Sequence, residues 1–258
     1  MTDNIKQLLP LIEKHSIFTE YDFRLIGGTA LSYHLQHRIS EDLDFCIAGD
    51  LPTDAIADFI AICVEQFGEE QIDFIEPSQA TKDDFEIHAD TVENYLQNWK
   101  IKDVRVTFFD SREGVGTREI LAENDYTQIG NIKIAGLDTI FKLKSLMFYK
   151  RSKSRDLFDM LSFYKLDDPG FTPESTKRLI QQYELAYRTD DGFALWRHAF
   201  KHRPYDKFRD EGLHGLTEDV KEYHEMKQEV LDLFDQLNEC SIERLNVLCF
   251  HKGKSGKT

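Results

Sequence analysis

Paired cysteines and long apolar runs are scarce in this sequence, and each shortage excludes a class of protein. The cysteines, Cys46, Cys63, Cys240 and Cys249, form no C-x-x-C pair and lack the histidine spacing of a zinc site. No stretch approaches the ~18 apolar residues that span a bilayer, and the first residues lack the apolar core of a signal peptide. We therefore expect a protein of the reducing cytoplasm with no membrane partner.

Positive charge is also in short supply. Lysine and arginine number 32 against 47 aspartates and glutamates, which gives a formal net charge of -15. Such a field repels nucleic acid, so an RNA partner would need a locally basic surface. The segment 133–165 has a local excess of cations that could attract a nucleotide or an RNA end, although a basic hinge that solvates a loop explains it equally well.

Hydrophobic periodicity predicts an α+β fold. Helical spacing of apolar residues predicts helices over 5–17, 29–38 and 53–67, with buried strands at FRLIGG and LDFCIAG that should be neighbours. More strands are predicted at IDFIE, FEIHA, VRVTFF and IKIA, which together give a mixed sheet flanked by helices. Beyond the turn at 167–170 the segments are helical, so we expect domains at 1–167 and 168–258, the second ending in a flexible basic tail.

Two carboxylates and a glycine turn are the strongest chemical signal. Asp42 and Asp44 are two apart in a predicted strand, so both side chains project from one face. Mg²⁺ prefers oxygen ligands and is often held by one or two carboxylates together with substrate phosphates. About 15 residues upstream, Gly27 and Gly28 leave the backbone open to phosphate at the start of a helix, where Thr29 could add a hydroxyl. A tight turn and a solvated strand end would explain either motif alone, but their combination favours a nucleotide site.

Two segments resemble a known family. The run GGTALSYHLQHRISEDLDF resembles the first motif of the AbiEii/AbiGii toxin-like nucleotidyltransferases, a branch of the polymerase-beta-type superfamily in which a glycine turn, a helix, Arg-x-Ser and Asp-x-Asp recur together. LDTIFKLKSLMFYKRSKSRDLFDM resembles the second region, a lysine-bearing helix followed by a basic turn and an Arg/Lys-Asp-x-x-Asp helix. The resemblance covers about residues 20–165 and implies an N-terminal nucleotidyltransferase-type mixed sheet followed by an all-helical domain.

The resemblance also implies roles for individual residues. Asp42 and Asp44 would hold Mg²⁺, or Mn²⁺, and Lys144 would bind the triphosphate, although an isolated lysine is more often merely solvated. Nucleotide-binding roles are implied for Gly27, Gly28, Thr29, Arg38, Ser40, Arg151, Arg155, Asp156 and Asp159. For the last two aspartates, pairing with a nearby arginine and capping of the helix are an equally good explanation.

A third carboxylate, which this superfamily generally uses to complete the metal site and activate the attacking hydroxyl, is missing from its expected place. In VRVTFFD that place is Thr107 or a neighbour, and the nearest acids are Asp103 and Asp110 at the ends of the strand. Asp110 is the candidate catalytic base, with Asp73 as a second candidate. The departure is also a reason to consider an inactive or weakened enzyme.

These signals predict an enzyme that transfers a nucleoside monophosphate from a nucleoside triphosphate to a hydroxyl and releases pyrophosphate. By resemblance, the acceptor is the 3' end of transfer RNA or a protein, and the chain is the toxin of a toxin-antitoxin or phage-defence pair with a cognate antitoxin. One alternative is a catalytically weakened module that binds a nucleotide or a partner. Another is a sugar-nucleotide glycosyltransferase with Mn²⁺ at Asp-x-Asp, which the short strand-turn-helix spacing disfavours.

Overall fold

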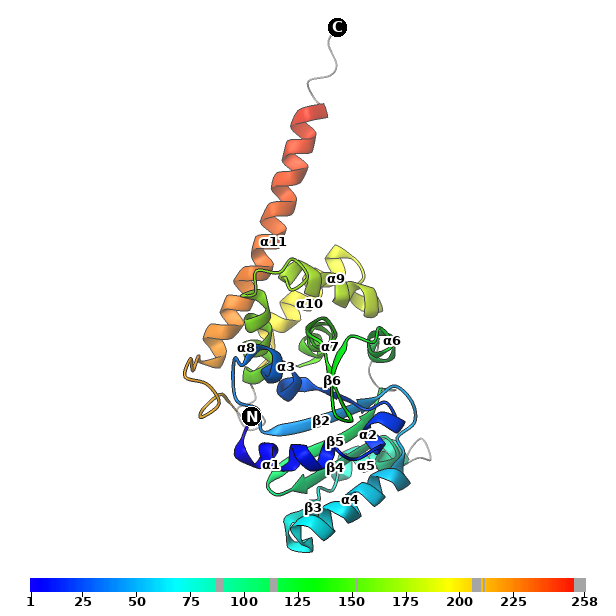
Figure 1. The fold of residues 1–258 in the computed structure, drawn as a ribbon. Coiled ribbons are helices and arrows are strands. Elements are labelled where there is room, and N and C mark those ends of the chain that lie inside the picture. The colour runs from blue at the N-terminus through cyan, green and yellow to red at the C-terminus, as the bar shows by residue number, and fades with distance from the viewer. Residues whose placement is uncertain (87–90, 112–115, 152, 206–209, 211, 253–258) are drawn as a thin grey trace. The chain divides into compact units, whose positions relative to one another are not determined.

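The computed structural model describes residues 1–86, 91–111, 116–151, 153–205, 210 and 212–252 (Figure 1). The chain divides into two units. Unit 1 comprises Met1–Lys144 and Gly215–Glu218, and unit 2 comprises Ser145–His214 and Asp219–Thr258. The predicted domain boundary after residue 167 separates parts of the chain that would fold independently. That boundary stays a prediction.

Unit 1 contains a mixed sheet. Its described strands are Arg24–Ile26 (β1), Asp42–Ile47 (β2), Ile72–Phe74 (β3), Leu96–Ile101 (β4), Val104–Asp110 (β5), Tyr126–Ile129 (β6) and Ile132–Ala135 (β7). They follow the order β3-β4-β5-β2-β1-β7-β6 (Figure 1). The central strand β2 runs antiparallel to β1 and parallel to β5, while β1 runs parallel to β7. The predicted α+β class is thereby confirmed, and β1 and β2 are neighbours as their short spacing requires.

Helices accompany this sheet. Those described in unit 1 are Asp3–Ile12 (α1), Ile17–Glu20 (α2), Gly27–Leu35 (α3), Thr53–Phe67 (α4), Gln79–Glu86 (α5) and Thr117–Ala122 (α6), with short 3-10 turns at Glu69–Gln71 (η1) and Val92–Asn94 (η2). Leu137–Lys150 (α7) begins in unit 1 and ends in unit 2. The helix predicted over 53–67 has those bounds in the structure because its apolar residues keep strict helical spacing up to Gly68.

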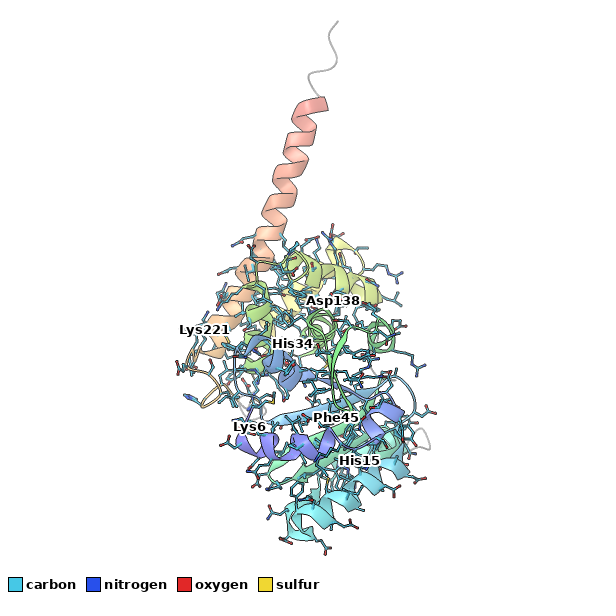
Figure 2. The ribbon with its side chains drawn as sticks, in the orientation of Figure 1. Lys6, His15, His34, Phe45, Asp138 and Lys221 are labelled. Atoms are coloured by element: carbon cyan, nitrogen blue, oxygen red, sulfur yellow. The ribbon has the colours of Figure 1, made fainter. Side chains whose placement is uncertain are left out.

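Aromatic side chains form the core on one face of the sheet. Phe45 of β2, labelled in Figure 2, lies in this core. Its ring stacks on that of Phe108 of β5 with ring centroids 5.7 Å apart, and the ring centroid of Phe18 of α2 lies 4.7 Å from that of Phe45. Phe59 of α4 meets Phe18 edge-on at 5.2 Å. Because side chains alternate along a strand, this packing directs residues 43, 45 and 47 of β2 into the core and leaves residues 42, 44 and 46 on the other face.

One predicted strand is wrong in part, and two strands were not predicted. The burst FEIHA begins inside α5, which runs to Glu86, while its residues 87–89 lie outside the described part of the chain. Strand β4 contains Gln97, Asn98 and Lys100, and strand β6 is short and mostly polar, so neither has clear apolar alternation. Both strands are specified by antiparallel pairing with a more apolar neighbour, β5 or β7.

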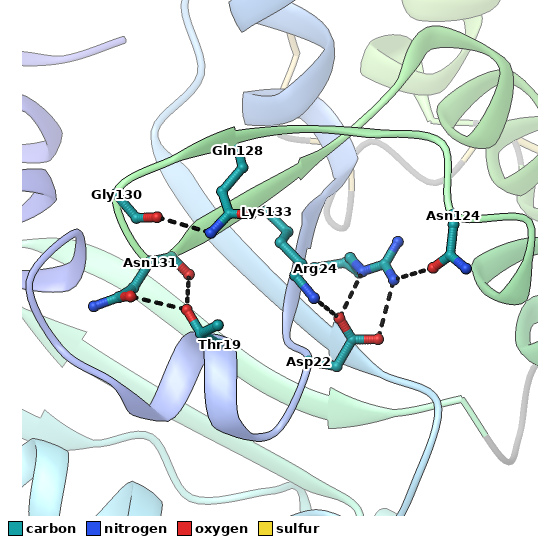
Figure 3. Close-up of polar contacts among 8 residues, drawn as sticks. All are labelled: Thr19, Asp22, Arg24, Asn124, Gln128, Gly130, Asn131 and Lys133. Atoms are coloured by element: carbon teal, nitrogen blue, oxygen red, sulfur yellow. Dashed lines mark hydrogen bonds and ion pairs between the residues drawn. The ribbon is translucent and has the colours of Figure 1, made fainter.

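A polar cluster joins β1 to β7 (Figure 3). The buried side chain of Arg24 donates two hydrogen bonds to the Asp22 carboxylate, at 3.2 and 3.0 Å, and one to Asn124 Oδ1 at 2.9 Å. Lys133, the Cα partner of Arg24, also pairs with Asp22. The Arg24 guanidinium lies over the Tyr126 ring, 4.4 Å from its centre, so this buried cation has an aromatic partner in addition to its hydrogen-bond acceptors.

Unit 2 is helical throughout its described elements. Besides the end of α7 it contains Ser154–Tyr164 (α8), Pro173–Tyr183 (α9), the 3-10 turn Leu185–Tyr187 (η3), Asp190–His202 (α10) and Tyr223–Lys252 (α11). The Thr172 hydroxyl accepts a hydrogen bond from the Ser175 amide, so α9 has a capped start. Trp196 is 1% exposed and stacks on Phe193 and Phe200, which gives this unit a core of its own.

Truncation of Phe59 tests the aromatic core of unit 1. Phe59→Ala should lower the free energy of unfolding by about 3–5 kcal/mol, because it removes a fully buried ring and leaves a cavity. Glu65→Ala, on the exposed side of the same helix, should change it by less than about 0.5 kcal/mol. Urea unfolding followed by circular dichroism measures both, and equal effects would contradict the packing described here.

Candidate active site

Asp42 and Asp44 lie on the face of β2 that is turned away from the aromatic core. In the sheet register Asp44 is the Cα partner of Ile26 on β1 and of Thr107 on β5. Asp42 is the Cα partner of Arg105 on β5. Asp44 therefore has a paired strand on either side, whereas Asp42 is paired on the β5 side alone.

The bend at Gly27 meets the carboxylate of Asp44. Gly27 has φ +72°, a left-handed conformation in which a side chain is strained. A Cβ atom on Gly27 would lie only 2.6 Å from Asp44 Oδ2. The geometry that a nucleotide site requires, with an acidic side chain close to a bare backbone turn, is thus present in unit 1.

Gly28, the next residue, faces the side chains of the Arg-x-Ser segment. A Cβ atom on Gly28 would lie 2.5 Å from Arg38 Nη2 and 3.2 Å from Ser40 Oγ. Arg38 and Ser40 are 7% and 4% exposed, so a buried cation and a buried hydroxyl lie beside the first turn of α3. The Ile39 amide between them donates a hydrogen bond to the Leu216 carbonyl at 2.6 Å, which ties this loop to the Gly215–Glu218 segment of the same unit.

The Thr29 side chain forms a hydrogen bond within the protein. It is 1% exposed, and its hydroxyl donates a hydrogen bond to the backbone carbonyl of Asp42. This bond fastens the start of α3 to the start of β2. The hydroxyl was predicted to reach a phosphate, and the structure instead places it where it positions Asp42.

The electrostatic environment of Asp44 disfavours its charged form. Removal from water is the main cause that raises the pKa of Asp44 above its ordinary value, and the nearby charge of Asp42 adds to it. Arg105, Lys144 and a hydrogen bond with Thr107 act in the opposite direction. Lys144 of α7, which only the family resemblance connected with the two acids, is therefore close enough to Asp44 to interact with its charge.

Arg105 was not predicted. Its Nη2 atom lies 2.9 Å from Asp42 Oδ2, and the two side chains are 44% and 23% exposed. The signal in the sequence is that Arg105 stands two residues before Thr107, so both project from the same face of β5. That signal becomes readable only when β5 is known to lie parallel to β2 with Asp42 opposite Arg105.

The structure argues against each acid considered as the third carboxylate. Thr107 itself is opposite Asp44, at the expected place. Asp110 lies three residues further along β5, about 10 Å away at about 3.3 Å per residue, and the odd offset turns its side chain to the other face. Asp73 is on β3, three strand spacings or about 14 Å from β2. Asp103 lies in the exposed turn before β5, paired with Lys100.

Metal ligands are correspondingly few. Within the described ranges, no group of three or more histidine, cysteine, aspartate or glutamate side chains is arranged to hold a metal ion. Two carboxylates on one face of β2 can still hold Mg²⁺ when substrate phosphates supply the remaining oxygens. The donor set present here fits that arrangement and does not fit an all-protein metal cage.

The second predicted motif lies in unit 2, where its side chains have partners. The Arg151 guanidinium pairs with Asp156 through two nitrogens, at 3.0 and 3.4 Å. Arg155 Nε donates a hydrogen bond to the Gly212 carbonyl at 3.2 Å, and Asp159 is 0% exposed. Pairing with an arginine, one of the two explanations offered for Asp156, is observed. Nucleotide-binding roles for these four residues stay predictions.

The sequence of this chain matches the model of a known protein family. A model of the family described as nucleotidyl transferase AbiEii toxin, type IV toxin-antitoxin system, matches residues 17–238, which is most of the chain. The chain belongs to the AbiEii family. It is therefore a nucleotidyltransferase, as the resemblance of its two motifs implied.

One of the matching solved structures shares the fold of this AbiEii-family protein. MenT4, a nucleotidyltransferase toxin from Mycobacterium tuberculosis H37Rv, is 14% identical, with a TM-score of 0.53 over 90% of this chain and 81% of that chain. A candidate nucleotidyltransferase from H. pylori is 18% identical over 95% of this chain and 99% of that chain, with a TM-score of 0.47. A comparison with curated proteins gave no match. In the described residues of this AbiEii-family chain, no helix is both long and apolar enough to cross a membrane.

Gly27 offers a direct test of the bend in this AbiEii-family protein. Gly27→Ala should cost about 1–2 kcal/mol of stability for the left-handed backbone, and it should also displace Asp44 and weaken binding of Mn²⁺ with nucleotide. Gly49→Ala is the matched control, because a Cβ atom there meets nothing within 4 Å. Thermal unfolding and Mn²⁺ titration measure the two effects, and unchanged Mn²⁺ binding in Gly27→Ala would contradict the contact.

The raised pKa of Asp44 predicts a pH-dependent stability. Since ionisation is harder in the folded state than in the unfolded state, the wild-type protein loses stability as pH rises through the folded-state pKa of Asp44. Asp44→Asn removes this cost, so without metal it should unfold at a temperature equal to or above that of the wild type at pH 7, with the gain shrinking as pH falls. Asp103→Asn, at an exposed carboxylate, should show no such gain. Thermal scans in a chelator measure this, and a large loss of stability in Asp44→Asn at pH 7 would refute it.

Proposed function

We propose that this AbiEii-family protein transfers a nucleoside monophosphate from a nucleoside triphosphate to a hydroxyl of RNA, at the 3' end of transfer RNA, or of a protein. The observation that carries the proposal is the position of the Asp44 carboxylate against the bare backbone of Gly27. In the reaction, the acceptor hydroxyl oxygen forms a bond to the α-phosphorus and the hydroxyl proton passes to solvent water. The bond from that phosphorus to the bridging oxygen breaks, and pyrophosphate leaves.

Asp42 and Asp44 would hold Mg²⁺, with Mn²⁺ as a substitute. Burial and the charge of Asp42 raise the pKa of Asp44. A divalent cation between the two carboxylates would stabilise their ionised forms and reduce their mutual repulsion. When bound, the ion supplies charge neutralisation for the triphosphate. Thr29 holds the Asp42 backbone in place through its hydrogen bond, so both acids are positioned before substrate arrives.

The phosphates would lie at the first turn of α3. Gly27 and Gly28 carry no side chains there, and backbone amides at the start of a helix attract anions. Arg38 and Ser40 stand next to Gly28 and would add a cation and a hydroxyl. Lys144 would neutralise the charge that develops on the departing pyrophosphate.

The biological role follows the description of the family. A family assigned to a type IV toxin-antitoxin system supports a toxin that is paired with a cognate antitoxin or acts in phage defence. We propose the same of this chain. We also propose that 1–167 forms the nucleotidyltransferase domain and that 168–258 folds as a separate helical domain.

A second candidate function is favoured by one observation. Thr107 stands opposite Asp44, where a third carboxylate was expected, and its hydroxyl donates a hydrogen bond to Asn98 Oδ1 at 3.0 Å. Without an acid at this position, the chain could bind nucleotide and a partner with little or no transfer. Nucleotide binding without pyrophosphate release would identify this weakened module.

Loss of Asp44 should abolish transfer. The protein is incubated with each labelled triphosphate, Mg²⁺ and total cellular RNA or protein, and both the labelled macromolecule and pyrophosphate are measured. Asp44→Ala should lower the rate by roughly a hundredfold or more, because the metal site loses one of its two carboxylates. Glu65→Ala should transfer at the wild-type rate. Full activity in Asp44→Ala would refute the proposal, provided that its circular dichroism spectrum is that of the folded protein.

A further inference from the structure

Arg105 forms an ion pair with one of the two candidate metal ligands, Asp42. It extends from β5 on the face that carries the two acids, and its guanidinium contacts the carboxylate of Asp42 at 2.9 Å. The contact is both a hydrogen bond and an ion pair, and the Arg105 side chain is 44% exposed. Arg105 therefore combines a fixed strand position with a head group that can reach solvent.

Nearby cations oppose the charges of the two acids. Asp42 and Asp44 carry two negative charges when ionised, and Arg105 and Lys144 carry two positive charges. Both cations interact favourably with the charge of Asp44, although burial and Asp42 have the larger effect on it. A free divalent cation would therefore approach two acids whose charge is already offset by neighbouring cations, and it would compete with the guanidinium for Asp42.

A metal-bound nucleoside triphosphate, unlike the free metal ion, carries a net negative charge. It brings an excess of negative charge along with the ion, and phosphate oxygens accept hydrogen bonds from a guanidinium as well as a carboxylate does. The cation released from Asp42 would thus gain a new partner in the substrate. The free-energy cost of breaking the ion pair is therefore offset more fully when the ion arrives with the nucleotide than when it arrives alone.

We propose that Arg105 is a positioning and selectivity residue, which holds Asp42 while the metal is absent and makes the site accept a metal-nucleotide complex in preference to the metal ion alone. The inference rests on the metal-binding role of Asp42 and Asp44 under the proposed function. It adds a role for Arg105, whose ion pair with Asp42 disfavours binding of the metal ion without nucleotide.

The test compares Mn²⁺ binding in the full-length protein with and without a non-hydrolysable nucleoside triphosphate, measured by electron paramagnetic resonance of free Mn²⁺. Arg105→Gln should bind Mn²⁺ alone more tightly than the wild type, by on the order of tenfold, because the competing cation is gone and solvent screening moderates the effect. With nucleotide present the variant should gain nothing or bind more weakly. The enhancement of Mn²⁺ binding by nucleotide should therefore shrink.

Two further variants separate charge from folding. Arg118→Gln makes the same charge change at an exposed position of α6 and should leave Mn²⁺ binding unchanged. Arg105→Lys keeps the positive charge and should bind Mn²⁺ alone as weakly as the wild type does. If Arg105→Lys behaves like Arg105→Gln, the packing of the guanidinium and not its charge controls the site, and the inference is overturned.

The outcomes also distinguish this inference from the proposed function. If Asp44→Asn abolishes Mn²⁺ binding while Arg105→Gln binds Mn²⁺ alone no better than the wild type, the role of Arg105 falls and the metal site stands. If neither the wild type nor any variant binds Mn²⁺ with or without nucleotide, the metal role of Asp42 and Asp44 is overturned, and the inference falls with it.

Discussion

The left-handed bend at Gly27 is the constraint on which the candidate site depends. A residue with a Cβ atom would be strained there and would collide with Asp44 Oδ2, so only glycine lets β1 turn into α3 directly beside the carboxylate of β2. The hydrogen bond from Thr29 to the Asp42 carbonyl then fixes the spacing between the helix and the strand. A three-residue strand, a short helix and the central strand of the sheet thereby form one rigid frame.

The site is assembled against an electrostatic cost. Two acids on one face of a strand repel each other, and burial raises the pKa of Asp44 further. The cations of Arg105 and Lys144 compensate for part of this cost, and Thr107, which fills the position opposite Asp44, adds no further negative charge. Asp42 therefore has a cationic partner, Arg105, while no metal ion is bound, and it could exchange that partner for a metal ion.

Prediction from the sequence succeeded where local pattern alone decides structure. The helix over 53–67 and the neighbouring strands β1 and β2 follow from apolar spacing and from the turn residues that end them. It failed for β4 and β6, whose polar residues become strands only through pairing with β5 and β7, and for the start of FEIHA, which is helical. Pairing across the sheet is a long-range property that a local window does not contain.

The sequence by itself determined the glycine bend, the Asp-x-Asp strand, the α+β class and membership in the AbiEii family, because each depends on residue types at short fixed spacing. The tertiary structure alone decided which distant residues join that motif. Register between β2 and β5 sets Arg105 against Asp42 and Thr107 against Asp44, and it separates Asp110 by about 10 Å. A shift of one residue in that register would turn every one of these side chains to the opposite face, and nothing in the spacing of the sequence fixes it.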